Sequence, residues 1–143
     1  MDDAGTEIAG GGLYAVDGTI VQVGRTEPLP AQADEVIDAG GMLIMPGMVN
    51  THHHFFQNLT RCMAQESNLF GWLTTLYPLW ANLTPEAIYT SSQTAIAELL
   101  LSGCTTSSDH TYIWPNGARL VNQIRAAQEL GMRFHAARGS MSV

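Results

Sequence analysis

The fold is decided by the stretch Pro46-Gly47-Met48-Val49-Asn50-Thr51-His52-His53-His54. The Pro-Gly pair ends the preceding segment, and the apolar residues after it predict a strand from Met48 to His52. Because side chains alternate along a strand, His52 and His54 are expected on one side and His53 on the other. Two imidazoles placed in this way can bind one metal ion. The alternative is a polar strand end with solvated histidines.

Strands and helices alternate after this stretch. We predict helices from Leu69 to Pro78, from Thr84 to Gly103 and from Leu120 to Gly131, and further strands over 105–108 and 133–138. This order indicates parallel strands joined by right-handed crossovers. Three such units fit either a doubly wound sheet or a (β/α)₈ barrel. A complete barrel needs about 250 residues, so a barrel would be incomplete here.

Residues 1–45 have a β pattern. Strands over 13–16 and 19–23 flank Asp17-Gly18, a dipeptide typical of a tight hairpin turn. Two short strands, 36–38 and 42–45, are predicted around Gly40-Gly41. Such strands bury little by themselves and suggest part of a small β-sandwich. We therefore expect two domains, residues 1–45 and residues 46–143.

Composition excludes several classes of protein. The 143 residues carry a net charge of −7 and only six Lys and Arg residues, so a nucleic-acid partner is not expected. No apolar run is long enough to span a membrane. Cys62 and Cys104 do not form a CxxC pair, which favours a reducing cytoplasm over a disulfide framework. A weakly charged small molecule suits this balance better than a polyanion.

The histidine stretch resembles the PG-x-V-N-x-H-x-H signature of the amidohydrolase superfamily, and the segments 17–20 and 36–41 resemble its β-sandwich lead-in. Four further segments are similar to the 8-oxoguanine deaminase branch of its cytosine, guanine and triazine aminohydrolase group. They are residues 50–61, 76–80, 105–110 and 137–142. The resemblance implies an α/β fold: an incomplete (β/α)₈ TIM barrel preceded by part of a small β-sandwich.

The resemblance also implies a cofactor. His52 and His54 would be ligands of one divalent metal, zinc in most members, with Fe²⁺ as the alternative. A later histidine, an aspartate and an HxxE pair complete the family's site, and none of them is matched in these 143 residues. We therefore expect an N-terminal fragment that holds no catalytic residue beyond the ligands and is inactive alone.

The implied reaction is hydrolytic deamination of a purine-like heterocycle. Metal-activated hydroxide would attack the amino-bearing ring carbon and release ammonia. The first candidate substrate is 8-oxoguanine, and isoxanthopterin, guanine and hydroxytriazine are alternatives. A non-catalytic scaffold or binding protein is a further alternative. The full-length protein is expected to be a homo-oligomer. The cytidine-deaminase type is disfavoured, since neither H-x-E nor P-C-x-x-C occurs.

Four residues are candidates for substrate binding. Gln57 follows His54 by three residues, and its amide could donate to and accept from the edge of a ring, unless it faces water. His110 and Arg138 are predicted near the carboxyl ends of strands, where barrel active sites lie. Each could instead be structural. Arg61 is an alternative to Arg138 as the partner of a ring carbonyl.

Overall fold

The computed structural model describes residues 4–140. The chain divides after Pro46 into two compact units. The first unit contains a two-stranded sheet, and the second contains a three-stranded sheet with its helices. The histidine stretch belongs to the second unit.

The first unit is built on a hairpin. Strands β1 (Gly11–Val16) and β2 (Thr19–Arg25) pair antiparallel. The two turn residues, Asp17 and Gly18, both have positive φ, 49° and 74°. Positive φ at both positions gives a turn whose twist matches that of the strands it joins. The hairpin predicted from Asp17-Gly18 is thus confirmed.

The two short strands predicted over 36–38 and 42–45 are wrong. Neither segment is a strand in the structure, and Val36 and Leu43 are 76% and 83% exposed. The segment instead bends at a turn in which the Met42 N–H donates to the Ala39 carbonyl oxygen at 2.9 Å. An apolar segment becomes a strand only when another strand accepts its backbone hydrogen bonds, and none does so among the described residues of this unit.

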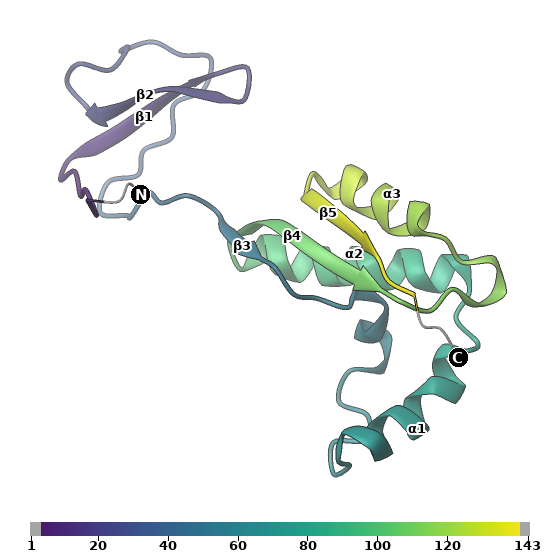
Figure 1. The fold of residues 1–143 in the computed structure, drawn as a ribbon. Helices are drawn as coiled ribbons and strands as arrows, with labels where there is room; N and C mark the ends of the chain where they lie inside the picture. Colours follow the sequence, from purple (N-terminus) through teal and green to yellow (C-terminus); the bar gives the residue numbers. More distant parts are fainter. Residues whose placement is uncertain (1–3, 141–143) are drawn as a thin grey trace. The chain divides into compact units, whose positions relative to one another are not determined.

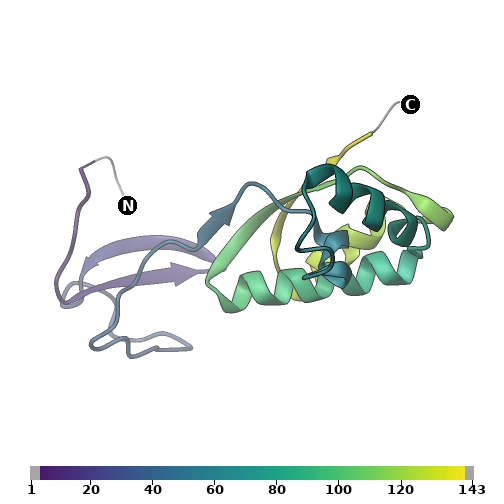
Figure 2. The ribbon, with the colours of Figure 1, turned by 90° about the horizontal axis from the view of Figure 1, so that it is seen from below.

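The second unit is a parallel α/β layer. Strands β3 (Met48–Asn50), β4 (Cys104–Thr111) and β5 (Arg133–Arg138) pair in the order β3-β4-β5, and both pairings are parallel. Helices α2 (Pro85–Leu101) and α3 (Leu120–Leu130) lie side by side on one face of this sheet (Figures 1 and 2). The predicted alternation of parallel strands and helices is confirmed.

The helix ends follow the sequence signals except at one proline. Thr84 caps α2, because its Oγ1 accepts from the Ala87 N–H at 3.1 Å. Helix α1 (Leu69–Trp80) was expected to end at Pro78, but it continues to Trp80. Pro78 lies in the last turn, where only one hydrogen bond is lost. That turn is held by the bond from the Ala81 N–H to the Tyr77 carbonyl oxygen, at 2.9 Å, and by the fully buried Trp80.

The segment just after the histidines is packed into the core of the second unit. This segment is the 3₁₀ helix η1 (Phe55–Thr60), and its first two residues are fully buried. The Phe55 ring stacks on Phe134 of β5, with ring centres 5.5 Å apart. Phe56 packs edge-on against Trp80 of α1, at 5.2 Å. Burial of each ring stabilises the fold by roughly 1.5–3 kcal/mol, so η1 is anchored in two core clusters at once.

Two further expectations concern cysteines and membranes. Cys62 is exposed and Cys104 is buried, and neither is in a disulfide. Within residues 4–140, no helix has both the length and the apolar character needed to cross a bilayer.

Candidate metal centre

The histidines follow the end of β3 instead of forming part of it. The strand ends at Asn50, so the strand predicted through His52 is two residues too long. The physical reason is a local turn: the Asn50 Oδ1 accepts from the His52 N–H at 2.9 Å. One sheet-like bond persists, from the His110 N–H to the His53 carbonyl oxygen at 3.0 Å. The chain therefore stays alongside β4 through His53.

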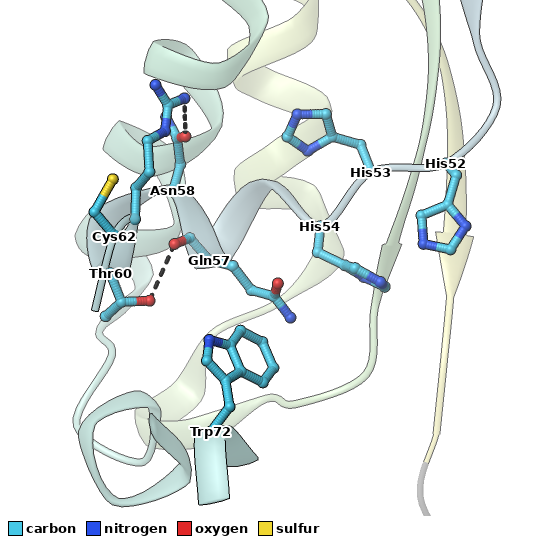
Figure 3. Close-up of a pocket in the computed structure, with 9 residues that line it drawn as sticks. His52, His53, His54, Gln57, Asn58, Thr60, Cys62 and Trp72 are labelled. Carbon is cyan, nitrogen blue, oxygen red and sulfur yellow. Dashed lines mark hydrogen bonds between the residues drawn. The ribbon is translucent and has the colours of Figure 1, made fainter. Parts of the chain in front are cut away.

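The alternation of the three rings survives this turn. His52 and His54 are close together, with ring centres 5.1 Å apart and ring planes at 87°. The ring of His53 points to the other side of the backbone (Figure 3) and lies edge-on to Phe55 at 4.8 Å. Two imidazoles that share a tetrahedral metal at about 2.0–2.1 Å have ring centres roughly 5 Å apart. The pair has the spacing that a shared ion requires.

A backbone group sets the tautomer of His54. Its Nδ1 lies 2.6 Å from the carbonyl oxygen of His110. A carbonyl oxygen can only accept, so Nδ1 carries a proton, and in the neutral ring Nε2 is the nitrogen with the lone pair. Histidines that bind metals are typically oriented in this way by a second hydrogen bond. His54 is therefore prepared to offer Nε2 to an ion.

The described residues do not complete a metal site. Within residues 4–140, no group of three or more His, Cys, Asp and Glu side chains is placed to hold an ion. A structural zinc site has four protein ligands and a catalytic one has three. His52 and His54 fit as two donors of such a set, and any further donor has to come from elsewhere.

The histidine stretch borders an open cavity of about 410 Å³. Gln57 lines it together with Trp72 of α1 (Figure 3). The Gln57 Nε2 donates to the Tyr112 hydroxyl at 3.0 Å. This bond leaves one N–H and the carbonyl oxygen of the Gln57 amide for other partners. The remaining lining residues are His52, His53, His54, Asn58, Thr60, Arg61 and Cys62.

Tyr112 is a site residue that the sequence analysis missed. Its ring centre lies 5.5 Å from that of His54 and 5.7 Å from that of His110. Burial is the main cause that raises the pKa of its hydroxyl, which favours the neutral form. Tyr112 follows the last residue of β4, and it lies two positions after His110. Strand alternation carried on from His110 would have placed it on the same side.

His110 lies beside the histidine pair. Its ring centre is 5.8 Å from that of His54. The ring also lies close to the backbone of Gly139: a Cβ at that position would be 2.5 Å from the His110 Nε2 and 2.9 Å from the Tyr112 Cβ. The structure therefore brings His110, Tyr112 and Gln57 together on the side of the sheet where His54 lies.

Arg61 is engaged elsewhere. Its guanidinium forms an ion pair with Glu98 of α2, in which NH1 donates to the Glu98 Oε1 at 2.8 Å. It also donates to the Asn58 Oδ1 at 2.5 Å. The hydrogen bond between Arg61 and Glu98 raises the pKa of the arginine and lowers that of the carboxyl. Arg61 borders the cavity, but its charge is already compensated.

Arg138 does not join the histidine pair. In the sheet it is opposite Thr111, a buried residue whose hydroxyl contacts Gln123 of α3. Alternation therefore starts its side chain on the face that the helices cover. Its guanidinium lies 5.8 Å from the ring centre of Trp114. The substrate-binding role of Arg138 stays a prediction.

On the opposite side of the stretch lie two titratable groups, the partly buried His53 and the fully buried Asp109. Burial is the first cause of the lowered pKa of His53, and the nearby Asp109 carboxyl opposes it. Burial is also the first cause of the raised pKa of Asp109, against the hydrogen bonds that this carboxyl accepts. In both residues burial disfavours the charged form. His53 therefore differs from His52 and His54 in the direction of its ring and in its electrostatic surroundings.

The sequence has similar relatives among characterised proteins. It is 49% identical to the 8-oxoguanine deaminase of Pseudomonas aeruginosa over 140 residues, which is 94% of this chain and 31% of that protein. It is 37% identical to the hydroxydechloroatrazine ethylaminohydrolase of Pseudomonas sp. strain ADP, over 99% of this chain and 33% of that protein. The chain thus spans about a third of the length of the curated relatives it matches.

The fold has solved counterparts. A mutant atrazine chlorohydrolase of Arthrobacter aurescens TC1, complexed with zinc and atraton, matches it with a TM-score of 0.86 and 28% identity. That match covers 99% of this chain and 34% of the other. A model of the amidohydrolase family matches residues 43–143, which include the histidine stretch, β4 and β5. The chain belongs to the amidohydrolase family.

Proposed function

We propose that the protein is a metal-dependent aminohydrolase that removes an amino group from a heterocyclic base, with 8-oxoguanine as the first candidate. The observation that carries this proposal is the paired arrangement of His52 and His54 beside an open cavity. Within residues 4–140, the hydrogen bond of the His54 ring is made by Nδ1, and Nε2 is left for an ion. The 49% identity to an 8-oxoguanine deaminase supports the choice of substrate.

We further propose that β3, β4 and β5 are the first strands of a (β/α)₈ barrel and that one divalent metal, zinc first, is held by the pair. The neighbour complexed with zinc supports this assignment. When bound, such an ion makes hydroxide available near neutral pH by lowering the pKa of water to about 7. The donors that the pair lacks would come from outside residues 4–140, as would the acid and base groups.

The residues of this chain would bind and orient. The His110 carbonyl oxygen holds the His54 ring in one tautomer. Gln57, held by Tyr112, presents one donor and one acceptor, which suits the edge of a purine-like ring. Arg61 is neutralised by Glu98, so the described part of the cavity favours an uncharged ligand over an anion. A homo-oligomeric state and a cytoplasmic location stay predictions from the sequence.

A triazine substrate is the second candidate. The 37% identity to a hydroxydechloroatrazine ethylaminohydrolase and the fold match to an atrazine chlorohydrolase favour it. A hydroxytriazine and an oxidised purine are both flat rings with carbonyl and N–H groups at their edges. Gln57 and Tyr112 could contact either ring. The choice between the two substrates would therefore be made by the part of the pocket that these residues do not form.

The test takes the full-length protein loaded with zinc. Ammonia release is followed with 8-oxoguanine, guanine, isoxanthopterin and cytosine, and ethylamine release with an ethylamino-hydroxytriazine. We expect the highest kcat/KM with 8-oxoguanine. If ethylamine is released faster than ammonia, the triazine becomes the preferred substrate and the purine proposal is rejected. A protein that turns over none of the five would be a binding or scaffold homologue, and the enzyme proposal would be abandoned.

A further inference from the structure

The carboxyl of Asp109 is buried beneath the histidine stretch and takes no part in the function proposed above. Only 1% of the residue is exposed. Its Oδ2 accepts from the Thr111 hydroxyl at 2.9 Å and from the Gln123 Nε2 at 2.6 Å. Its Oδ1 accepts from the Phe55 N–H at 2.6 Å. A buried carboxyl is costly unless it is hydrogen-bonded, and this one has three donors.

The Phe55 N–H is the group that connects this carboxyl to the candidate metal site. It belongs to the peptide bond that joins His54 to Phe55, and that peptide is planar. Fixing the N–H direction therefore fixes the ψ angle of His54, which is 81°. The carboxyl thus restricts rotation about the Cα–C bond of His54, and the side chain of His54 is attached at that Cα.

A second side chain holds the other polar group of Phe55. The Ser91 hydroxyl, on α2, donates to the Phe55 carbonyl oxygen at 2.6 Å. Ser91 is fully buried, as is Phe55 itself. The two peptides that flank Phe55 are therefore tied to β4 by Asp109 and to α2 by Ser91. Neither bond belongs to a regular strand or helix ladder.

Adjacent residues of β4 hold His54 from two sides. The His110 carbonyl oxygen accepts a hydrogen bond from the His54 Nδ1–H, and the Asp109 carboxyl accepts one from the Phe55 N–H. We infer that Asp109, supported by Ser91, is a positioning residue that sets the backbone of His54 so that its Nε2 faces the ion. This inference rests on the metal site proposed above and assigns no contact between Asp109 and the ion or substrate.

The amide variant separates geometry from charge. Asp109→Asn keeps an oxygen acceptor for the Phe55 N–H. Its new N–H₂ group would face both donors of the Asp109 Oδ2. The Thr111 hydroxyl can turn and accept, and Gln123 can rotate its amide and present Oε1. Within residues 4–140, that Oε1 is buried and has no hydrogen-bond partner. Asp109→Asn is therefore expected to retain the tether, meaning the hydrogen bond that side chain 109 accepts from the Phe55 N–H, and Asp109→Ala to lose it.

Two neighbouring serines give a matched pair for the second tether. Ser91 and Ser92 are both fully buried on α2. The Ser91 hydroxyl donates to the Phe55 carbonyl oxygen, whereas the Ser92 hydroxyl donates to the Ile88 carbonyl oxygen of its own helix, at 2.7 Å. Each Ser→Ala substitution removes one buried hydroxyl, but only the first releases the histidine stretch.

The experiment uses full-length protein with Co²⁺ in place of zinc. The visible absorption of bound Co²⁺ reports ligand geometry, and competition with a chelator gives the metal Kd. Neither readout needs turnover. We expect Asp109→Ala to raise the Kd about 10- to 100-fold, the usual effect of losing an outer hydrogen-bond partner, and to change the spectrum. Asp109→Asn should restore most of both. Ser91→Ala should raise the Kd several-fold, and Ser92→Ala should not.

The outcomes distinguish this inference from the proposed function. Wild-type protein that binds Co²⁺ through the histidines but deaminates nothing contradicts the function and leaves the inference standing. Should Asp109→Ala not fold, the two serine variants decide, because only one of them touches the tether. If Asp109→Ala and Ser91→Ala both keep the wild-type Kd and spectrum while losing thermal stability as Ser92→Ala does, the network is merely structural and the inference is overturned. Wild-type protein that binds no Co²⁺ through this pair overturns it as well.

Discussion

The Nδ1 of His54 donates a hydrogen bond of 2.6 Å to the backbone carbonyl oxygen of His110. This bond joins the segment after β3 to the end of β4. It also fixes which nitrogen of His54 is protonated, and so which nitrogen can bind an ion. Because the partner is a backbone atom, the bond is independent of the side chain at position 110. We therefore expect this bond to persist when the His110 side chain is replaced.

The first prediction concerns metal content. His52→Ala and His54→Ala should each lower bound metal by one equivalent per protomer in the full-length protein and abolish turnover. Each variant removes one donor from a site in which every donor counts. Elemental analysis after dialysis measures the metal. Glu86→Ala, at an exposed position in the first turn of α2, is the control and should keep both metal and rate. Full occupancy in His52→Ala or His54→Ala would remove the ligand assignment.

The second prediction concerns Gly139. In Gly139→Ala the new Cβ would meet the His110 ring and the Tyr112 Cβ, so both residues must shift. Misplacement of site residues by about 1 Å can reduce kcat/KM up to about 100-fold. Metal content should not change, because the His110 side chain does not bind the ion in our account. Gly24→Ala is the control, since no atom lies within 4 Å of its added Cβ. Unchanged kinetics in Gly139→Ala would show that the ring of His110 is free to move.

The third prediction separates two roles for Arg61. If Arg61 serves mainly to tie η1 to α2, then Arg61→Ala and Glu98→Ala should lower Tm to a similar small extent, and the double variant should cost no more than either alone. KM should stay at the wild-type value in all three. Steady-state kinetics with thermal denaturation would check both. A rise in KM confined to Arg61→Ala would instead place its guanidinium on the substrate.

The fourth prediction is a pH dependence of stability. Hydrogen bonds from Tyr89, the larger cause, and from Arg125 hold the pKa of Glu129 below its ordinary value of 4.5. A carboxyl with a lowered pKa in the folded state stabilises the fold fully above 4.5, and this contribution is lost as the pH falls through the folded pKa. The gap in unfolding free energy between wild type and Glu129→Gln should therefore close on acidification.

Urea denaturation at a series of pH values measures that gap. Glu66→Gln, at an exposed position, removes one negative charge elsewhere and controls for net charge. A gap between wild type and Glu129→Gln that stays constant from neutral pH to well below 4.5 would show that the Tyr89–Glu129–Arg125 contacts do not persist in solution.

The sequence predicted those features that depend on local signals. The hairpin at Asp17-Gly18 and the cap at Thr84 each need only a few neighbouring residues, and both are present. The pairing of His52 with His54 also follows from alternation, which survives the early end of β3 at Asn50. Pro78 was misjudged because the buried Trp80 two residues later extends the helix, and burial is a tertiary effect.

The rest depends on contacts between distant residues. The prediction for Arg138 used only its position near the end of a strand. It did not show that the side chain leaves the backbone on the face covered by the helices, where Thr111 is its neighbour in the sheet. Arg61 was predicted to be a substrate partner because the residue that pairs with it, Glu98, is 37 residues away in the sequence. Tyr112 could have been found by continuing the alternation from His110, whereas the tether from Asp109 to Phe55 spans 54 residues and has no local signal.

Anomalous diffraction at the zinc edge, from crystals of the full-length protein, shows whether His52 and His54 share one ion. We predict one strong peak at about 2.0–2.1 Å from Nε2 of His54 and from one ring nitrogen of His52, with Nδ1 of His54 still bonded to the His110 carbonyl oxygen. A zinc-loaded crystal with no peak between these two rings, or with the ion held by other residues, would contradict it.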